Sequence, residues 1–218
     1  MRLVFASNNA HKLAEVREIM PAGIEVLSLR EIGFEHDIEE TGVTLEENSA
    51  IKARTVADFI GERLTVKGER IDGVFADDTG LEIDALGGKP GVYTARWYLQ
   101  DEGATEAKTE MENYALNRAK ALRELDGQSN RGCQFRTVIT LIKAKGEGRE
   151  AKGAEIQVEG IVRGRITTEE YGEGGFGYDP IFVPEGYDKT FGELPAEVKN
   201  NISHRARALA QLVKVLQP

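Results

Sequence analysis

The stretch VFADDTGLEIDAL, residues 74–86, combines two strand patterns with a pair of adjacent carboxylates. Val74 to Ala76 is an apolar run of strand length, and Leu81 to Leu86 alternates apolar and polar residues as a half-exposed strand does. Asp77 to Gly80 separates the two runs, and we interpret it as a turn. Ligand-binding carboxylates commonly follow a strand at the carboxyl edge of an α/β sheet, which makes this pair a candidate for chemistry. A solvated Asp-rich turn explains the segment equally well.

Strands and helices alternate on the N-terminal side of this stretch. Leu3 to Ala6 has the length and apolarity of a strand, and Leu13 to Met20 has apolar residues at helical spacing. Ile24 to Leu29 is a second strand candidate, and Leu45 to Ile60 has a helical pattern. This alternation predicts an α/β fold.

The C-terminal side adds a helix and two longer strands. Thr105 to Leu125 carries a helical apolar stripe on a charged segment. Gln134 to Lys143 and Glu155 to Ile166 are rich in β-branched residues, and the glycine-rich segment Lys145 to Gly153 between them predicts the tip of an antiparallel hairpin. The sheet is therefore expected to be mixed. We also predict a short strand over Ile181 to Val183 and a terminal helix with one apolar face: Ile202, Ala206, Leu209, Val213 and Leu216.

Composition limits the classes of function. The formal net charge of -9 works against general binding to nucleic acid or to an anionic membrane. Cys133 is the only cysteine, so an internal disulfide is excluded, and one cysteine with three histidines argues against a structural zinc site. The N-terminal segment shows no targeting signal. We expect a cytoplasmic protein that binds neither nucleic acid nor membrane.

Ser7 to Lys12 is a candidate phosphate site. It lies where a strand passes into a helix, so backbone N–H groups and the positive end of the helix dipole can meet an anion, and Lys12 adds a full charge. It lacks the glycines and the Gly-Lys-Ser/Thr ending of a P-loop. A polar turn with an asparagine cap is the simpler explanation of this segment alone.

Gly172 to Gly177 matches the dinucleotide pattern G-x-G-x-x-G, but no strong strand signal precedes it and Pro180 follows where a helix should run. We reject the dinucleotide hypothesis. A cluster of glycines around Phe176 is instead typical of a backbone that lets a flat ligand approach the ring, with Tyr178 and Asp179 beside it. A tight loop that buries Phe176 in the core is the alternative.

Two further segments carry polar groups that suit a ligand. The pair Glu39-Glu40 has the composition of a solvated face, with a metal role as the alternative. Ser203-His204-Arg205 is predicted at the start of the terminal helix, where Ser203 is an ordinary cap. His204 and Arg205 place donors where an anion or a carbonyl-rich base can be bound.

Taken together, these segments resemble the inosine/xanthosine triphosphate pyrophosphatase family across nearly the whole chain. Ser7 and Thr79 stand where many members carry threonine and serine, and both keep a hydroxyl. The resemblance is looser from Trp97 to Gly132, and we place the specificity residues outside that segment. The stretches that carry it are ASNNAHKLAEV at 6–16, EETGVTLEENSAIKAR at 39–54, FADDTGLEIDALGGKPGVYTAR at 75–96, GEGGFGYDPIF at 172–182 and EVKNNISHRARAL at 197–209.

The resemblance implies one α/β domain over residues 1–218, with a long mixed sheet and flanking helices that form two lobes around a deep central cleft. It also implies a homodimer and a magnesium-dependent enzyme. The implied reaction converts ITP, dITP, XTP and dXTP to the monophosphate and pyrophosphate. Action on another modified or a pyrimidine nucleotide is one alternative, and a nucleotide-sensing module without turnover is another. Asp78, Glu40 and Lys12 argue against the sensor, because a protein that only binds its ligand needs no metal-held water.

The resemblance also implies roles for individual residues. Asp78 would be the catalytic carboxylate and, with Glu40, a magnesium ligand, while Asp77 would support them and Thr79 would contact substrate. The residues that would hold the triphosphate are Ser7, Asn8, Asn9, Ala10, His11, Lys12 and Lys52. Those that would hold the nucleoside are Phe176, Gly177, Tyr178, Asp179, Lys199, His204 and Arg205.

Base discrimination has a chemical rationale. Hypoxanthine and xanthine carry a 6-oxo group, whereas adenine carries a 6-amino group. Donors from His204 or Arg205 would be left unsatisfied against adenine, at a cost of about 1 to 3 kcal/mol each.

Overall fold

The structure is a computed structural model that describes residues 1–61, 65–66, 68–144 and 153–217. The chain forms two compact units. Unit 1 consists of residues 1–78, 137–160 and 205–218, and unit 2 of residues 79–136 and 161–204. No described helix is both long enough and apolar enough to cross a membrane.

The main sheet is mixed, as the sequence predicts. Its strand order is β2-β1-β5-β7-β8-β9, and β6 pairs with β5. Strand β1 pairs in parallel with both β2 and β5, whereas the β5–β6 and β8–β9 pairs are antiparallel. The strands are β1 (Arg2–Phe5), β2 (Glu25–Leu27), β5 (Gly73–Ile83), β6 (Pro90–Gly91), β7 (Gly132–Lys143), β8 (Glu155–Ile166) and β9 (Phe182–Pro184), and a separate pair is formed by β3 (Thr65–Val66) and β4 (Glu69–Arg70).

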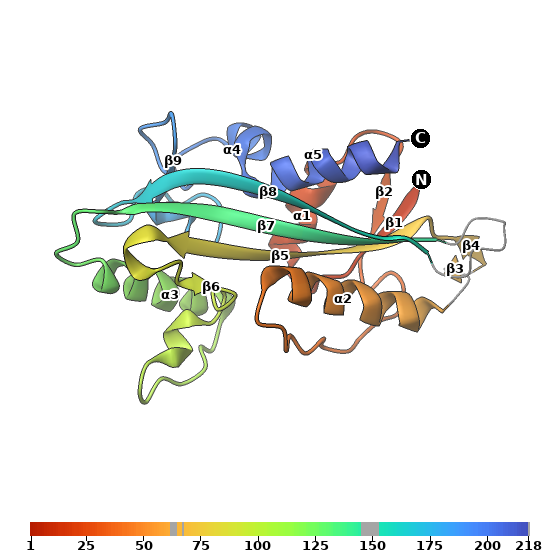
Figure 1. The fold of residues 1–218 in the computed structure, drawn as a ribbon, viewed down its shortest axis with the longest axis horizontal. Coiled ribbons are helices and arrows are strands. Elements are labelled where there is room, and N and C mark those ends of the chain that lie inside the picture. Colours follow the sequence, from red (N-terminus) through yellow and green to blue (C-terminus); the bar gives the residue numbers. More distant parts are fainter. Residues whose placement is uncertain (62–64, 67, 145–152, 218) are drawn as a thin grey trace. The chain divides into compact units, whose positions relative to one another are not determined.

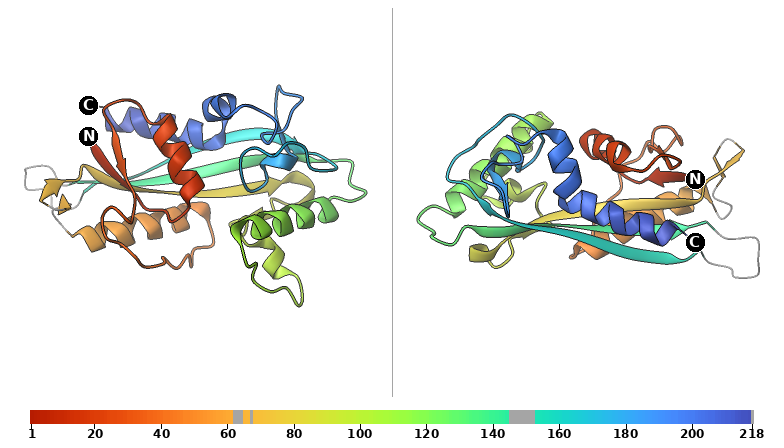
Figure 2. Two further views of the ribbon diagram at one scale, coloured as in Figure 1. Left: turned by 180° about the vertical axis from the view of Figure 1, so that it is seen from behind. Right: turned by 90° about the horizontal axis from the view of Figure 1, so that it is seen from above.

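Unit 1 has a hydrophobic core on each face of its part of the sheet (Figures 1 and 2). Successive strand residues point to opposite faces, so Leu3 and Phe5 of β1 belong to one core and Val4 to the other. Helices α1 (Ala10–Ile19) and α5 (His204–Leu216) contribute to the first core, and α2 (Leu45–Ile60) contributes to the second. The observed bounds of α2 are those predicted from its apolar pattern.

Unit 2 is built around one aromatic-rich core that includes Trp97, Phe135, Tyr178 and Phe182. Cys133 lies fully buried in this core, and burial raises the pKa of its thiol to about 12. The helical elements of the unit are the 3-10 helices η1 (Asp84–Leu86), η2 (Trp97–Gln100) and η3 (Asp179–Ile181) and the α-helices α3 (Glu110–Glu124) and α4 (Ala196–Ile202).

The predicted turn at Asp77 to Gly80 is wrong. Strand β5 runs without a break from Gly73 to Ile83, and η1 follows where the second strand was expected to continue. A buried strand with two adjacent aspartates is tolerated because cations pair with both carboxylates. The aspartates therefore lie within a strand instead of following one.

Helix boundaries also differ from the sequence pattern. Helix α3 begins five residues later than expected because Thr109 caps it, with its Oγ1 accepting the N–H of Glu112 at 3.1 Å. The single terminal helix is two helices, interrupted at Ser203, whose extended backbone ends α4. Ile202 consequently belongs to α4 and contacts the core of unit 2.

The hairpin strands are confirmed. The N–H of Lys143 donates to the carbonyl of Ala154 at 3.0 Å, and that of Ile166 donates to the carbonyl of Arg131 at 2.9 Å. Both bonds fit one antiparallel register, which agrees with the predicted pairing. Residues 145–152 of the predicted tip lie outside the described residues.

Candidate functional site

The predicted phosphate segment forms the start of α1 in unit 1. Asn9 caps the helix, and its side-chain oxygen accepts the N–H of Lys12 at 2.9 Å. The N–H of Asn9 in turn donates to the Ser7 hydroxyl at 3.3 Å. Asn8, Ala10 and His11 are exposed. The strand-to-helix transition is therefore present, with backbone N–H groups at the positive end of the helix dipole.

Asp77 is the centre of a buried ionic group in unit 1. The Lys12 ammonium lies 2.9 Å from one carboxylate oxygen, and Nε of Arg205 lies 3.1 Å from the other. Arg205 also pairs with Glu15. Burial acts to raise the pKa of Asp77, but Lys12 and Arg205 outweigh it and hold that pKa well below its usual range. Asp77 is thus ionised at neutral pH. For Lys12 burial prevails, and its pKa is lowered.

Asp78 belongs to a second ionic group. Nζ of Lys52, on α2, lies 2.9 Å from Oδ1 of Asp78 and 2.7 Å from Oε1 of Glu40. Burial raises the pKa of Asp78, and the attraction of Lys52 does not cancel that effect. Burial acts to lower the pKa of Lys52, but the two carboxylates prevail and raise it. One ammonium therefore brings two carboxylates together.

The two aspartates act in different groups because adjacent residues of a strand point to opposite faces. Phe75 lies in the core beside α1 and α5, and Asp77, two residues on, meets Lys12 of α1 and Arg205 of α5. Ala76 lies in the core beside α2, and Asp78 meets Lys52 of α2. Thr79 follows as the first residue of unit 2 and is half-buried.

The glycine cluster of unit 2 is organised by a buried ion pair. Asp179 Oδ2 accepts the N–H of Phe176 at 2.8 Å and lies 2.6 Å from the Lys199 ammonium. The same ammonium lies 4.7 Å from the centre of the Phe176 ring. Gly175 has φ of +72°, and a Cβ there would lie 2.0 Å from Asp179 Oδ2, so only glycine fits. The cluster thus shapes the backbone around Phe176.

Phe176 is half-buried and does not fill the core, whereas Tyr178 does. The Tyr178 hydroxyl donates to the carbonyl of Thr94 at 2.9 Å. The alternative of a tight loop that buries Phe176 in the core is therefore wrong, and Tyr178 is the residue of this loop that the core contains. The Phe176 ring is the one in this loop that keeps part of its surface accessible.

Helix α3 supplies two contacts to this loop that sequence reasoning missed. Nη1 of Arg118 donates to the carbonyl of Gly177 at 2.9 Å, and the Tyr114 ring lies 6.1 Å from the Phe176 ring. Both residues lie in the segment Thr105 to Leu125, for which the sequence predicts a helix and no role in a site. Their spacing of four residues places them on one helix face, which was the available signal.

His204 and Arg205, predicted to act together on the base, fall in different units. The His204 ring lies 4.8 Å from Phe135 in unit 2 and is buried. Arg205 is buried in the ionic group of Asp77 in unit 1. Their contact with a base stays a prediction.

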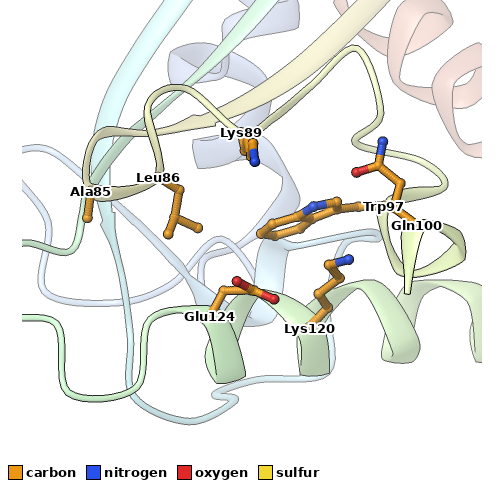
Figure 3. A pocket seen from close by; sticks show the side chains of 7 residues that line it. All are labelled: Ala85, Leu86, Lys89, Trp97, Gln100, Lys120 and Glu124. Carbon is orange, nitrogen blue, oxygen red and sulfur yellow. The ribbon is translucent and has the colours of Figure 1, made fainter. Parts of the chain in front are cut away.

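A cavity of about 490 Å³ lies in unit 2, and none of its lining residues was predicted as a site residue. The Trp97 indole lies in the middle of the lining, with Lys120 and Glu124 of α3 reaching toward it (Figure 3). Lys120 is engaged by Asp101 at 2.5 Å. The other lining residues are Ala85, Leu86, Lys89 and Gln100.

The described residues contain no group of three or more His, Cys, Asp or Glu side chains placed to hold a metal ion. Glu40 and Asp78, which both contact Lys52, are the candidate magnesium ligands, because both offer carboxylate oxygens.

Comparison with known proteins gives full-length matches. The sequence model of the Ham1 family matches residues 3–215. The dITP/XTP pyrophosphatase of Flavobacterium johnsoniae is 43% identical over 216 residues, covering 99% of this chain and 98% of the relative. That of Bacillus subtilis is 43% identical over 217 residues, covering 98% and 96%.

Solved structures agree with these matches. The Staphylococcus aureus Ham1 protein superposes with a TM-score of 0.76 at 35% identity, with 99% of this chain and 98% of that chain covered. A nucleoside-triphosphatase / dITP/XTP pyrophosphatase from Mycobacterium abscessus gives a TM-score of 0.66 at 36% identity, covering 98% and 99%.

Proposed function

The chain belongs to the Ham1 family, and from that membership we propose that it is a dITP/XTP pyrophosphatase. It hydrolyses dITP, XTP and the related ITP and dXTP to the nucleoside monophosphate and pyrophosphate. Full-length relatives named for this activity support the proposal at 40% to 43% identity.

The observation that carries the chemistry is the bridge made by Lys52. Its ammonium holds Glu40 and Asp78 at 2.7 and 2.9 Å, so two carboxylates and a cation meet at one point. Attack of water on a triphosphate needs positive charge for the phosphate oxygens and a carboxylate for the water. This group offers both.

Magnesium suits the donors of this group. Mg²⁺ takes hard oxygen ligands, and in nucleotide-dependent enzymes it is held by one or two carboxylates together with substrate phosphates. Glu40 and Asp78 are such a pair, and a third protein ligand is not required. Bound there, magnesium would neutralise charge on the phosphate oxygens.

The two aspartates then have separate tasks. Asp78 orients the attacking water and accepts its proton, which suits a carboxylate whose pKa is raised by burial. Asp77 holds Lys12 and Arg205 in place and stays ionised. Lys12 and the N–H groups at the start of α1 bind the phosphates.

Unit 2 provides the nucleoside end of this proposal. The accessible Phe176 ring stacks on the base, and the Lys199–Asp179 pair fixes the loop that carries it. Thr79 and His204 are further proposed substrate contacts in unit 2, and Arg205 is one in unit 1. A homodimer and a cytoplasmic location are also part of the proposal.

Pyrophosphate release across a panel of nucleotides, with and without Mg²⁺, tests the function. We expect turnover of dITP and XTP well above that of ATP and GTP, and none after chelation. Phosphorus NMR should show monophosphate and pyrophosphate in equal amounts. Diphosphate with orthophosphate would place the attack at the γ-phosphorus and contradict the proposal, and a preference for a pyrimidine nucleotide would change the substrate class.

A further inference from the structure

Asn48 is a fully buried polar residue to which neither the sequence nor the proposed reaction assigns a role. It lies on α2 four residues before Lys52, so the two side chains share one helix face. Apolar residues are the usual occupants of such a face. A buried amide one helical turn before Lys52 therefore needs an explanation.

The Asn48 side chain holds the loop that carries Glu40. Its Oδ1 accepts the N–H of Gly42 at 2.8 Å. The next N–H, of Val43, donates to Glu47 Oε2 at 2.7 Å. A Cβ on Gly42 would lie 2.6 Å from Asn48 Oδ1, so the loop lies directly against the helix. The backbone two residues after Glu40 is thus fixed to α2.

Helix α2 consequently holds Glu40 at two points. Lys52 binds its carboxylate at 2.7 Å, and Asn48 fixes its backbone through Gly42. A cation bound to Glu40 would compete with Lys52 for the carboxylate oxygens, whereas the contact through Asn48 uses the backbone and no carboxylate oxygen. The Asn48 contact is therefore the one that can keep Glu40 in place in the metal-bound state.

The chemistry of position 48 favours a neutral acceptor. Nδ2 of Asn48 is buried and has no hydrogen-bond partner among the described residues, which is uncommon in folded proteins. An aspartate at position 48 would accept the Gly42 N–H and would have no N–H group left without a partner, but it would add a negative charge on the helix face that carries Lys52. Asparagine accepts the bond without changing the charge of the site.

We propose that Asn48 is a positioning residue for metal binding, which sets Glu40 through its hydrogen bond to Gly42. This inference rests on the proposed function, in which Glu40 is a magnesium ligand. Residues that hold a metal ligand in place typically contribute about 10- to 100-fold to metal affinity. Asn48 should therefore affect metal binding while acting only through Glu40.

The test is a titration of the full chain with Mn²⁺ in the presence of pyrophosphate, in which electron paramagnetic resonance measures Mn²⁺ binding. Asn48→Ala should weaken Mn²⁺ binding by about tenfold or more. In a Glu40→Gln background the same change should have no further effect, because residues that act through one another are not additive. Gly42→Ala disturbs the same contact from the loop side, and it should weaken Mn²⁺ binding even if Asn48→Ala fails to fold.

Ser49→Ala is the matched control. Ser49 is the next residue of α2, is equally buried, and its hydroxyl lies 2.7 Å from that of Thr140. Its removal should leave Mn²⁺ affinity unchanged. The inference is overturned if Asn48→Ala binds Mn²⁺ as the wild type does, if the loss persists in the Glu40→Gln background, or if the wild type binds no Mn²⁺.

Turnover of dITP by the wild type is measured separately. A wild type that lacks turnover but whose Mn²⁺ binding depends on Asn48 through Glu40 would contradict the proposed function and leave this inference standing.

Discussion

The ionic groups of unit 1 and the Phe176 loop of unit 2 use buried charge in different ways. In unit 1, three cations, Lys12, Lys52 and Arg205, meet carboxylates around β5. In unit 2, the Lys199–Asp179 pair and a hydrogen bond from Arg118 support a loop whose central feature is an aromatic ring.

In the proposed function, this difference corresponds to separate roles for the two groups of residues. A dense set of charges suits the polyphosphate, whose own charge changes during hydrolysis. An aromatic ring beside an ion pair whose charges cancel suits a flat base, because a base is bound by contact area more than by charge. Changes in unit 1 should therefore affect stability and turnover, and changes in unit 2 should affect substrate affinity.

The largest effect is expected for Asp77→Asn. It leaves Lys12 and Arg205 without their shared anion, and breaking a buried pair in this way costs about 3 to 5 kcal/mol. Urea unfolding measures the loss. Glu155→Gln is the control, since its pair with Arg54 is largely exposed and is worth about 1 kcal/mol or less. Equal losses in the two variants would contradict the assignment of Asp77 as a buried anion.

The same variant has an expected pH dependence. The folded-state pKa of Asp77 is lowered, so its contribution is complete above the unfolded value of about 3.9 and is lost as the pH falls below it. The difference in unfolding free energy between wild type and Asp77→Asn should be constant near neutral pH and shrink below about pH 4. If the difference in unfolding free energy grew on acidification, the folded-state pKa of Asp77 would be raised and not lowered.

Asp78→Asn should lower turnover by about 10²-fold or more while the protein stays folded, because the amide keeps the shape but accepts no proton. Pyrophosphate release and thermal unfolding are measured on the same preparation. Asp84→Asn, at an exposed ion pair with Arg163 in unit 2, should keep full turnover. Near-normal turnover of Asp78→Asn would remove this residue from the catalytic role.

A smaller effect is expected in unit 2. Phe176→Ala should raise the Michaelis constant by an amount equivalent to about 1 to 3 kcal/mol, similarly for every purine nucleotide, because stacking tolerates base identity. The ratio of kcat/KM for dITP and ATP should not change. A variant that lost turnover with an unaltered Michaelis constant would place Phe176 outside base binding.

The reactivity of the Cys133 thiol reports on the packing of the unit 2 core without any substitution. Burial raises the pKa of its thiol to about 12, and the thiolate is the reactive form. We expect no alkylation by iodoacetamide at pH 8 in the native protein, and complete alkylation in urea. Rapid native modification would show that this core opens.

The limits of sequence reasoning are clearest in β5. Apolar residues on either side of the aspartates predict extended backbone in both halves of β5, but the sequence pattern also predicts a turn at residues 77–80, where the strand in fact continues. Whether Asp77 and Asp78 end a strand depends on whether cations meet them, and those cations come from residues 12, 52 and 205. Local sequence carries no information about such distant partners.

The sequence by itself determined the mixed α/β fold, the bounds of α2, the hairpin strands and the family, because periodicity and ordered motifs are local properties. The tertiary structure alone decided which aspartate meets which cation, since the pleat of β5 sends neighbours to opposite faces. It also decided that Tyr178 fills the core beside an accessible Phe176, and that Arg118 fixes the Gly177 carbonyl. These outcomes depend on contacts between residues far apart in the chain, whose geometry exists only once the chain has folded.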